Sequence, residues 1–403
     1  MKAGWKASKI GDVCRLTTGG TPSKTKPEYF QGGNIRWLVS GDVHQKEIFD
    51  CEGRITQLGF ENSNARYLPE NSVIIALNGQ GKTRGTVALL RTKATCNQSL
   101  VAITPTDPTL LDPEFLYYSL HGRYAEIRKI TGDAGNERRG LNMPIIRNIG
   151  VPLPPLEEQQ RIVAILDEAF EGLDRARANA EANLQNAREL FESAVNSLFL
   201  NAEDGWSKKT LGELCEKITD GTHQTPTYFE DGHVFLSSKN VVDGVLDWDN
   251  VKYIDEKQHV QMQKRLSPKI NDILLRKNGA GYGKAAKVDR EVVFDVYVSL
   301  AVLRPKNLID PDFLLLSINS TRTMDQFNAR IKGSGVPNLH LQEIREVLIS
   351  FPKNITTQKV LTERFADLLN ECRGLEERYR LKFQDLADLR QSLLQKAFAG
   401  ELT

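Results

Sequence analysis

The chain contains two copies of one sequence unit of about 200 residues, and this duplication limits its possible folds more than any other feature. Similar residues recur at a nearly constant offset along the whole length. The clearest pairs are Gly4-Trp5 with Gly205-Trp206, Thr18 with Thr219, Gly20-Thr21 with Gly221-Thr222, Asp112-Pro113 with Asp310-Pro311, Phe115-Leu116 with Phe313-Leu314, Pro154 with Pro352, and Gln160 with Gln358. A tandem repeat with pseudo-two-fold organisation is therefore predicted.

The first 150 or so residues of each copy predict a mixed globule of strands and short helices. Apolar, β-branched runs separated by Gly, Asn and Pro are typical of buried strands. These runs are Val73–Leu77, Thr86–Leu90, Ser99–Ile103, Asp272–Leu275 and Val292–Phe294. One helix is expected from Pro113 to about Lys129 and its counterpart from Pro311 to about Arg330, each with Pro in its first turn.

The rest of each copy predicts one long helix. Glu157 to about Leu200 contains no Pro and a single Gly, and its apolar residues follow coiled-coil spacing. The first seam is Ile162, Leu166, Ala169, Leu173, Ala176, Ala180, Leu184, Ala187, Phe191, Ala194 and Leu198. The second is Leu361, Phe365, Leu368, Cys372, Leu375, Tyr379, Phe383 and Leu386. Because the second globule joins the end of one helix to the start of the other, antiparallel pairing is predicted.

The predicted fold class is α+β, with two similar α/β globular domains separated by two long antiparallel coiled-coil helices. The expected boundaries are 1–153 for the first globule, 154–204 for the first helix, 205–352 for the second globule and 353–403 for the second helix. A helix of about 44 residues is about 66 Å long, and such a coil would separate the two globules like a ruler.

Composition excludes several classes of protein. The chain has 53 Lys and Arg against 52 Asp and Glu, a net charge of +1, which excludes a simple polycationic nucleic-acid binder. The charge is uneven, since residues 1–153 carry +6 and residues 154–204 carry −7. The acidic helix is either a solvated face or a contact for a protein partner. The sequence predicts no membrane span and no signal peptide. Five scattered cysteines without a CxxC pair fit a reducing cytoplasm.

A glycine-rich segment of each copy could approach phosphates. Ala76–Thr83 resembles a relaxed P-loop, but the residues after it predict a turn and a strand, whereas a P-loop needs a helix there. The equivalent segment of the second copy is Asn278–Lys284. We expect glycine-rich hairpins that bring basic side chains to a nucleic-acid backbone, with a plain structural turn as the alternative. These candidates are Lys82, Arg84, Lys277 and Lys284.

A second pair of loops differs between the copies while the flanking residues agree. Hydroxyl, amide, imidazole and ammonium groups in these loops could contact base edges or phosphates. The candidates are Thr21, Ser23, Lys24, Thr222, His223 and Gln224. This pattern is expected of one scaffold that presents two specificities, with a simple polar turn as the alternative. The six histidines show no metal-ligand spacing, and the sequence predicts neither a metal site nor a catalytic centre.

Four segments resemble the specificity subunits of type I restriction–modification systems. Val151–Val163, with the sequence VPLPPLEEQQRIV, resembles the start of their first conserved helix, and Ala397–Thr403 resembles the end of the second. Gly205-Trp206 and Asp220–His223 resemble the opening of a target recognition domain. Phe351–Gln358 departs from the Pro-rich pattern of the first helix start.

The resemblance implies a non-catalytic, sequence-specific DNA-binding subunit. Each globule would be a target recognition domain that reads one half of a split target in double-stranded DNA. The coil would hold two modification subunits that methylate adenine with S-adenosylmethionine, and restriction subunits would add ATP- and Mg-dependent translocation and cleavage. No cofactor is expected on this chain. Two other classes stay open at this point: a divergent P-loop ATPase and a coiled-coil scaffold protein.

Overall fold

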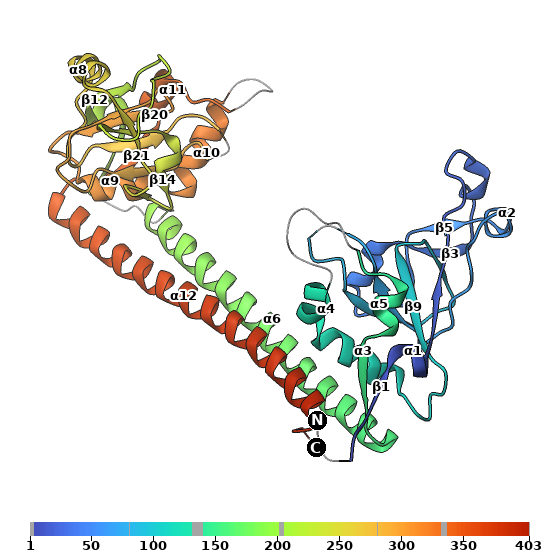
Figure 1. The fold of residues 1–403 in the computed structure, drawn as a ribbon. Helices are drawn as coiled ribbons and strands as arrows, with labels where there is room; N and C mark the ends of the chain where they lie inside the picture. Colours follow the sequence, from blue (N-terminus) through green and yellow to red (C-terminus); the bar gives the residue numbers. More distant parts are fainter. Residues whose placement is uncertain are drawn as a thin grey trace. The chain divides into compact units, whose positions relative to one another are not determined.

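A computed structural model describes residues 4–79, 81–130, 140–200, 205–279, 281–331 and 337–402, without the side chains of residues 199 and 200. Within it the chain forms two compact units (Figure 1). The first unit comprises Met1–Ala180 and Leu381–Thr403, and the second comprises Glu181–Arg380. Each unit therefore joins one globular domain to one half of each long helix.

The first domain is built on three sheets. Its strands are β1 (Lys6–Lys9), β2 (Cys14–Thr18), β3 (Ile35–Leu38), β4 (Glu47–Ile48), β5 (Arg54–Ile55), β6 (Val73–Ala76), β7 (Val87–Leu90), β8 (Thr95–Cys96), β9 (Leu100–Pro105) and β10 (Gly150–Leu153). Its helices are α1 (Ile10–Val13), η1 (Pro27–Tyr29), η2 (Ser40–His44), α2 (Gln57–Glu61), α3 (Pro113–Gly122), α4 (Tyr124–Ile130) and α5 (Met143–Arg147). The strand orders are β2-β9-β6-β7-β4, β5-β3-β8 and β1-β10.

The second domain repeats this plan. Its strands are β11 (Trp206–Thr210), β12 (Cys215–Asp220), β13 (His233–Leu236), β14 (Val241–Val242), β15 (Val245–Leu246), β16 (Lys252–Ile254), β17 (Ile273–Arg276), β18 (Ala285–Lys287), β19 (Phe294–Val296), β20 (Leu300–Pro305) and β21 (Leu348–Pro352). Its helices are α7 (Leu211–Leu214), η3 (Ser238–Asn240), α8 (Glu256–Arg265), α9 (Pro311–Ile318), α10 (Thr321–Arg330) and α11 (Leu341–Arg345). The orders are β12-β20-β17-β18, β16-β13-β19, β11-β21 and β14-β15.

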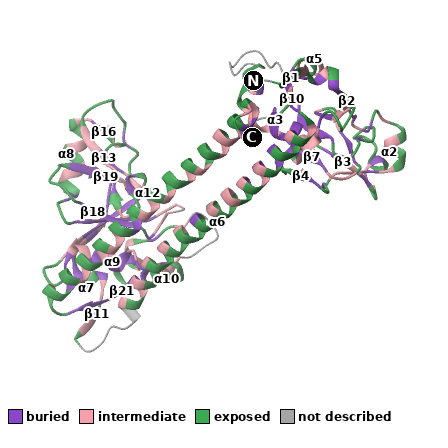
Figure 2. Ribbon diagram, turned by 90° about the horizontal axis from the view of Figure 1, so that it is seen from below, coloured by how far each residue is buried: buried purple, intermediate pink, exposed green. Residues whose placement is uncertain are grey.

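Strand registers agree between the two domains. Val73 lies opposite Ile103 in the β6–β9 pair, and Ile273 lies opposite Leu303 in the β17–β20 pair. These central strands are buried because both of their faces are covered, as their continuous apolar sequences predict (Figure 2). The predicted tandem α+β fold is confirmed.

The two long helices, α6 (Leu156–Leu200) and α12 (Ile355–Ala399), run antiparallel within each unit. In the first unit, Arg390 near the end of α12 pairs with Asp174 of α6. In the second unit, Arg188 Nε lies 2.6 Å from Glu376 Oε1. The predicted seam residues are all buried or partly buried, and most positions between them are exposed (Figure 2). Val163, Phe170 and Val195 of α6 are also buried, although they lie outside the predicted seam. Within the described residues no helix is long and apolar enough to span a membrane.

A buried glutamine fixes the start of each long helix to its domain. Gln159 Oε1 accepts a hydrogen bond from the N–H of Asp112 at 2.9 Å, and its Nε2 donates to the carbonyls of Leu110 and Pro154, both at 2.9 Å. Gln358 makes the same set, with 2.7 Å from the N–H of Asp310. The predicted equivalence of Gln160 with Gln358 is therefore wrong by one residue: Gln159 is the counterpart, and Gln160 is exposed.

The same bonds explain why the Asp-Pro-x-Phe-Leu motif recurs. Asp112 and Asp310 cap α3 and α9 by accepting hydrogen bonds from backbone N–H groups of the first turn. The Pro that follows has no N–H to satisfy, and Phe115 and Phe313 are fully buried. Much of the detectable repetition is therefore needed for folding.

Each predicted single helix after this motif is broken in two. The helix expected over 113–129 ends at Gly122 and resumes as α4, and the helix expected over 311–330 is divided between α9 and α10. Leu394 of α12 packs against Gly122, where an added Cβ would lie 3.1 Å from the Leu394 Cβ. In the second unit, the side chain of Asn319 bonds the backbone of Ala285 and Ser320 caps α10, so the chain turns between them.

Candidate nucleic-acid interface

The glycine-rich segment of the first domain is a β-hairpin. It joins β6 to the antiparallel β7, with Ile75 opposite Val87. A strand therefore follows the glycines where a P-loop requires a helix N-terminus, so the P-loop ATPase interpretation is wrong. The hairpin is held by α4, because Tyr124 Oη donates to the carbonyl of Lys82 at 2.9 Å and Arg128 donates to the carbonyl of Gly81.

The basic side chains of the two hairpins differ in their availability. Lys82 is exposed, and so is Lys284 in the second domain. Arg84 is half-buried, and its Nε is buried without a hydrogen-bond partner among the described residues. Lys82 and Lys284 are therefore the hairpin cations that a phosphate could reach directly.

Lys277 is a core residue, which corrects its predicted role as a phosphate contact. Its Nζ lies 2.6 Å from Asp220 Oδ2, and the two side chains are only 8% and 5% exposed. Arg265 and His223 also face this carboxylate, at 3.0 and 3.3 Å. Burial by itself raises the pKa of Asp220, but the hydrogen bond and charge of Lys277, helped by His223, leave that pKa below its ordinary value. An ammonium held in this way cannot turn outward to a phosphate.

The variable loop of the first domain follows β2 and carries Thr21, Ser23 and Lys24. It packs against the domain at its start and is exposed further on. A Cβ at Gly19 would collide with the carbonyl of Cys96, so only glycine fits there. Thr21 Oγ1 lies 2.6 Å from Gln98 Oε1, to which it donates. Ser23 and Lys24 are exposed. Of the three predicted residues of this loop, Ser23 and Lys24 are the more accessible.

The variable loop of the second domain has the same design. A Cβ at Gly221 would collide with the carbonyl of Val296. The N–H of Thr222 donates to that same carbonyl at 3.0 Å, so Thr222 is occupied in joining the loop to the domain. His223 and Gln224 are exposed. The side chains that differ between the copies therefore lie beyond a fixed glycine in both domains.

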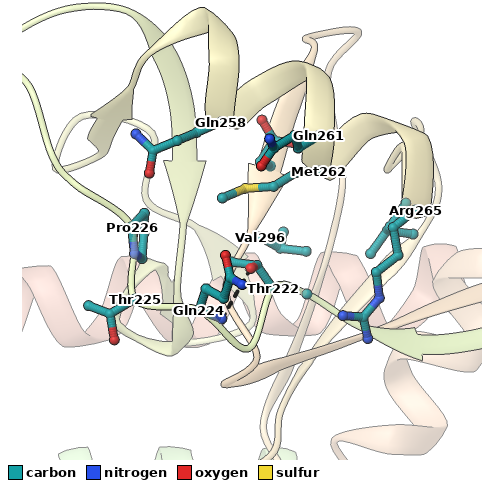
Figure 3. Close-up of a pocket in the computed structure, with 12 residues that line it drawn as sticks. Thr222, Gln224, Thr225, Pro226, Gln258, Gln261, Met262, Arg265 and Val296 are labelled. Atoms are coloured by element: carbon teal, nitrogen blue, oxygen red, sulfur yellow. Dashed lines mark hydrogen bonds between the residues drawn. The ribbon is translucent and has the colours of Figure 1, made fainter.

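A hollow of about 210 Å³ lies between this loop and helix α8 (Figure 3). The loop lines it with Thr222, Gln224, Thr225 and Pro226, and the helix lines it with Gln258, Gln261, Met262 and Arg265. Sequence reasoning missed α8, because a segment with so few apolar residues gives no clear hydrophobic period. A usable signal was present: Asp255 caps the helix, and Lys and Gln recur at helical spacing after it.

Two stacked histidines support the inner side of α8. The rings of His233 and His259 are 3.8 Å apart and nearly parallel, and each ring contacts a carboxylate, Glu256 at 2.5 Å and Asp295 at 2.6 Å. Burial raises the pKa of Asp295, although its hydrogen bonds from His259 and Gln263 act in the opposite direction. No group of three His, Cys, Asp or Glu side chains in the described part of the chain is arranged to hold a metal ion.

Comparison with known families identifies the repeat. Residues 2–183 and 203–382 each match the family model described as the type I restriction modification DNA specificity domain. The chain belongs to this family. It is a specificity subunit of a type I restriction–modification system, as its two matched domains and its relatives agree.

Two of the relatives span nearly the whole chain. The specificity subunit of the enzyme MjaIX from Methanocaldococcus jannaschii is 24% identical, over 99% of this chain and 93% of its own length. The EcoKI specificity subunit of Escherichia coli is 21% identical, over 100% and 90%. Among solved structures, the HsdS subunit from Thermoanaerobacter tengcongensis has a TM-score of 0.63 at 20% identity, covering 100% of this chain and 98% of that one. A chain from a study of type I system assembly and conformational transition has a TM-score of 0.80, also at 20% identity, covering 100% and 99%.

Proposed function

We propose that each domain of this specificity subunit reads one half of a split target in double-stranded DNA. The observation that carries this proposal is a contrast between the buried contacts of the two domains and their exposed loops. The buried glutamines, the Asp caps and the strand registers are the same in both domains, while the exposed loops after β2 and β12 differ. A shared scaffold with different exposed side chains is suited to two different base sequences.

The proposal assigns DNA contacts to the exposed predicted residues and leaves chemistry to partners. Ser23, Lys24, His223 and Gln224 are accessible to DNA from the loops, and Lys82 and Lys284 from the hairpins. The paired long helices would bind two modification subunits that methylate adenine with S-adenosylmethionine. Restriction subunits would supply ATP- and Mg-dependent cleavage. A cytoplasmic location belongs to the same proposal, supported by five cysteines that are all free thiols.

The test is the methylation pattern of the host chromosome. Sequencing with methylation detection in strains with and without this gene should show one two-part motif that depends on the gene. Each part should be a few specified base pairs, with unspecified base pairs between them. A gene-dependent motif that is one continuous sequence, or the absence of any gene-dependent motif, would contradict the proposal.

A further inference from the structure

Helix α8 and the variable loop of the second domain rest on the same strand, β19. On the inner side of the helix, His259 Nδ1 lies 2.6 Å from Asp295 Oδ2, and Gln263 Nε2 donates to Asp295 Oδ1 at 2.9 Å. The loop bonds the next residue of the strand, since the N–H of Thr222 donates to the carbonyl of Val296. Because Asp295 is buried, water does not compete for these bonds, and they hold the helix against the strand.

The side chain of Gln258 joins the helix to the loop directly. Its Oε1 accepts a hydrogen bond from the N–H of Thr227 and its Nε2 donates to the carbonyl of Thr227, both at 3.0 Å. A side-chain amide that bonds both backbone groups of one residue holds the backbone independently of the loop's own side chains. Both walls of the hollow between α8 and the loop are therefore held by hydrogen bonds. Figure 3 shows the residues of the two walls that face each other across it.

The outer side of α8 carries an exposed polar stripe. Lys257, Gln261 and Lys264 are spaced four and three residues apart, so they share one helical face, and all three are exposed. Within the described residues the amide of Gln261 has no hydrogen-bond partner. The two lysines are about 10 Å apart along the axis, close to the ~12 Å width of the major groove of B-DNA.

The first domain has a much smaller element at this place. There the strand β5 is followed by α2, which has five residues and no Lys or Arg, whereas β16 is followed by the ten residues of α8. The strands before the two helices occupy the same position in their sheets. The two domains thus differ in size and charge beside the loop that also differs, as expected of a part that distinguishes two targets.

We infer that α8 is the base-reading helix of the second domain. Gln261, with Gln224 on the facing loop, contacts base edges in the major groove, and Lys257 and Lys264 bind phosphates on either side. A glutamine amide offers a donor and an acceptor together, which match the N6 and N7 positions of adenine. Gln258 is a positioning residue, because its amide is occupied by Thr227. This inference rests on the proposed function and names the residues that carry it in one domain.

The test uses the full chain produced together with its modification subunit in a host that lacks adenine methylation. The host chromosome is the probe, and its methylated motif is read by sequencing. We expect Gln261→Ala to lose about a tenfold preference at one base pair of one half, leaving the other half unchanged. Gln342→Ala is the matched control, since Gln342 is an exposed glutamine on α11 of the same unit, and it should leave the motif intact.

The outcomes separate this inference from the proposed function. A wild-type complex without a two-part motif would overturn the proposed function, whereas an unchanged motif for Gln261→Ala would overturn the role of α8 alone. If Gln261→Ala abolishes methylation, binding is measured on duplexes that carry the wild-type motif with one base pair changed in each. Equal binding of two bases at one position supports the inference, and a uniform loss on every duplex overturns it.

The lysines are tested separately on the wild-type motif. Lys257→Ala and Lys264→Ala should keep the motif and each reduce the slope of log affinity against log salt by about one. Unchanged slopes in both variants would remove α8 from the DNA backbone and overturn the inference.

Discussion

The carboxylate of Asp220 has three cationic or basic neighbours, and one of them, Lys277, is buried with it. Removing the charge at position 220 would leave a buried ammonium without its counter-ion, which is far less favourable than losing an exposed ion pair. By contrast, Arg265 is about half exposed, so water can replace the carboxylate there.

We expect Asp220→Asn to lower the free energy of unfolding of the second domain by about 3 kcal/mol at pH 7. Native-state hydrogen exchange of the amides in β12 and β17 measures this loss locally. Asp231→Asn removes the charge of an exposed aspartate in the same domain and should change stability by less than about 0.5 kcal/mol. Equal losses of stability in the two variants would mean that the buried ion pair contributes no more than an exposed carboxylate.

The same pair predicts an acid dependence. Because the pKa of Asp220 is lowered below its ordinary value of 3.8, its contribution is fully present above pH 3.8 and disappears as the pH falls through the lower folded pKa. The stability difference between the wild-type protein and Asp220→Asn should therefore not fall between pH 7 and about pH 4, because protonation of the neighbouring His223 can only add to it, and it should shrink below that. Exchange or denaturant unfolding at several pH values measures it, and a difference that shrinks above pH 5 would contradict the assignment.

Lys82 is the exposed lysine in the hairpin of the first domain, so we expect its replacement to change DNA binding and not the stability of the fold. Lys82→Ala should weaken binding to every duplex about equally and reduce the salt slope by about one. Lys6→Ala, at an exposed lysine on β1 of the same domain, is the control and should leave the slope unchanged. A salt titration of the assembled complex on matched and mismatched duplexes makes the comparison. An unaltered slope for Lys82→Ala would reduce the hairpin to a structural turn.

For single residues, the sequence identified the basic side chains of the hairpins but did not show which of them are buried. Lys277 and Lys284 flank the same glycine-rich hairpin, and nothing local distinguishes them. What separates them is Asp220, which is distant in sequence and reaches Lys277 through the packing of β12 beside β20 and β17. The loop residues were easier, because a polar residue next to a turn is usually exposed.

Among the elements, the start of α6 offers a matched pair of neighbouring glutamines. Gln159→Leu keeps the size of the side chain but leaves the N–H of Asp112 and two carbonyls without their partner. Buried polar groups that lose a partner destabilise by about 1–3 kcal/mol each, and partial relaxation should leave a total of about 3 kcal/mol. Thermal unfolding should show a clear fall in Tm for Gln159→Leu and little change for Gln160→Leu. The reverse order would restore the original alignment of Gln160 with Gln358.

The end of α12 offers a second matched pair. Leu394 is 2% exposed and packs against Gly122 and the core of the first domain, whereas Leu389 on the same helix is 49% exposed. We expect Leu394→Ala to destabilise the first unit by about 2–5 kcal/mol and Leu389→Ala by less than about 0.5 kcal/mol. Urea unfolding measures both. Similar losses at the two positions would mean that α12 is not packed on this domain.

The periodicity of the long helices was sufficient to predict seam positions that are buried or partly buried, because a heptad pattern is a property of the sequence alone. The breaks at Arg123 and Asn319 were not predictable in the same way. They depend on Leu394 pressing against Gly122 and on Asn319 bonding Ala285, and both contacts join segments that are distant in the chain. Helix α8 was missed for a related reason, since its fixed side is polar and bonds Asp295 instead of joining an apolar core.

Across the whole molecule, the duplication predicts that the two specificities are separable. Replacing residues 1–153 with the corresponding domain of another specificity subunit should change one half of the methylated motif and leave the other half as it was. The replacement must keep an aspartate cap and a backbone that Gln159 can bond. Methylome sequencing of the host measures the result. A change in both halves would contradict independent reading by the two domains.

Gln258 has one further consequence. Because its amide bonds the main chain of Thr227 and makes no demand on the identity of residues 224 and 225, those two positions are not needed to shape their own loop. Point mutations there can accumulate without unfolding intermediates, so a lineage can drift from one target to another through variants that all remain folded. The two hydrogen bonds of Gln258 thus hold the loop in place and also leave its exposed side chains free to change during evolution.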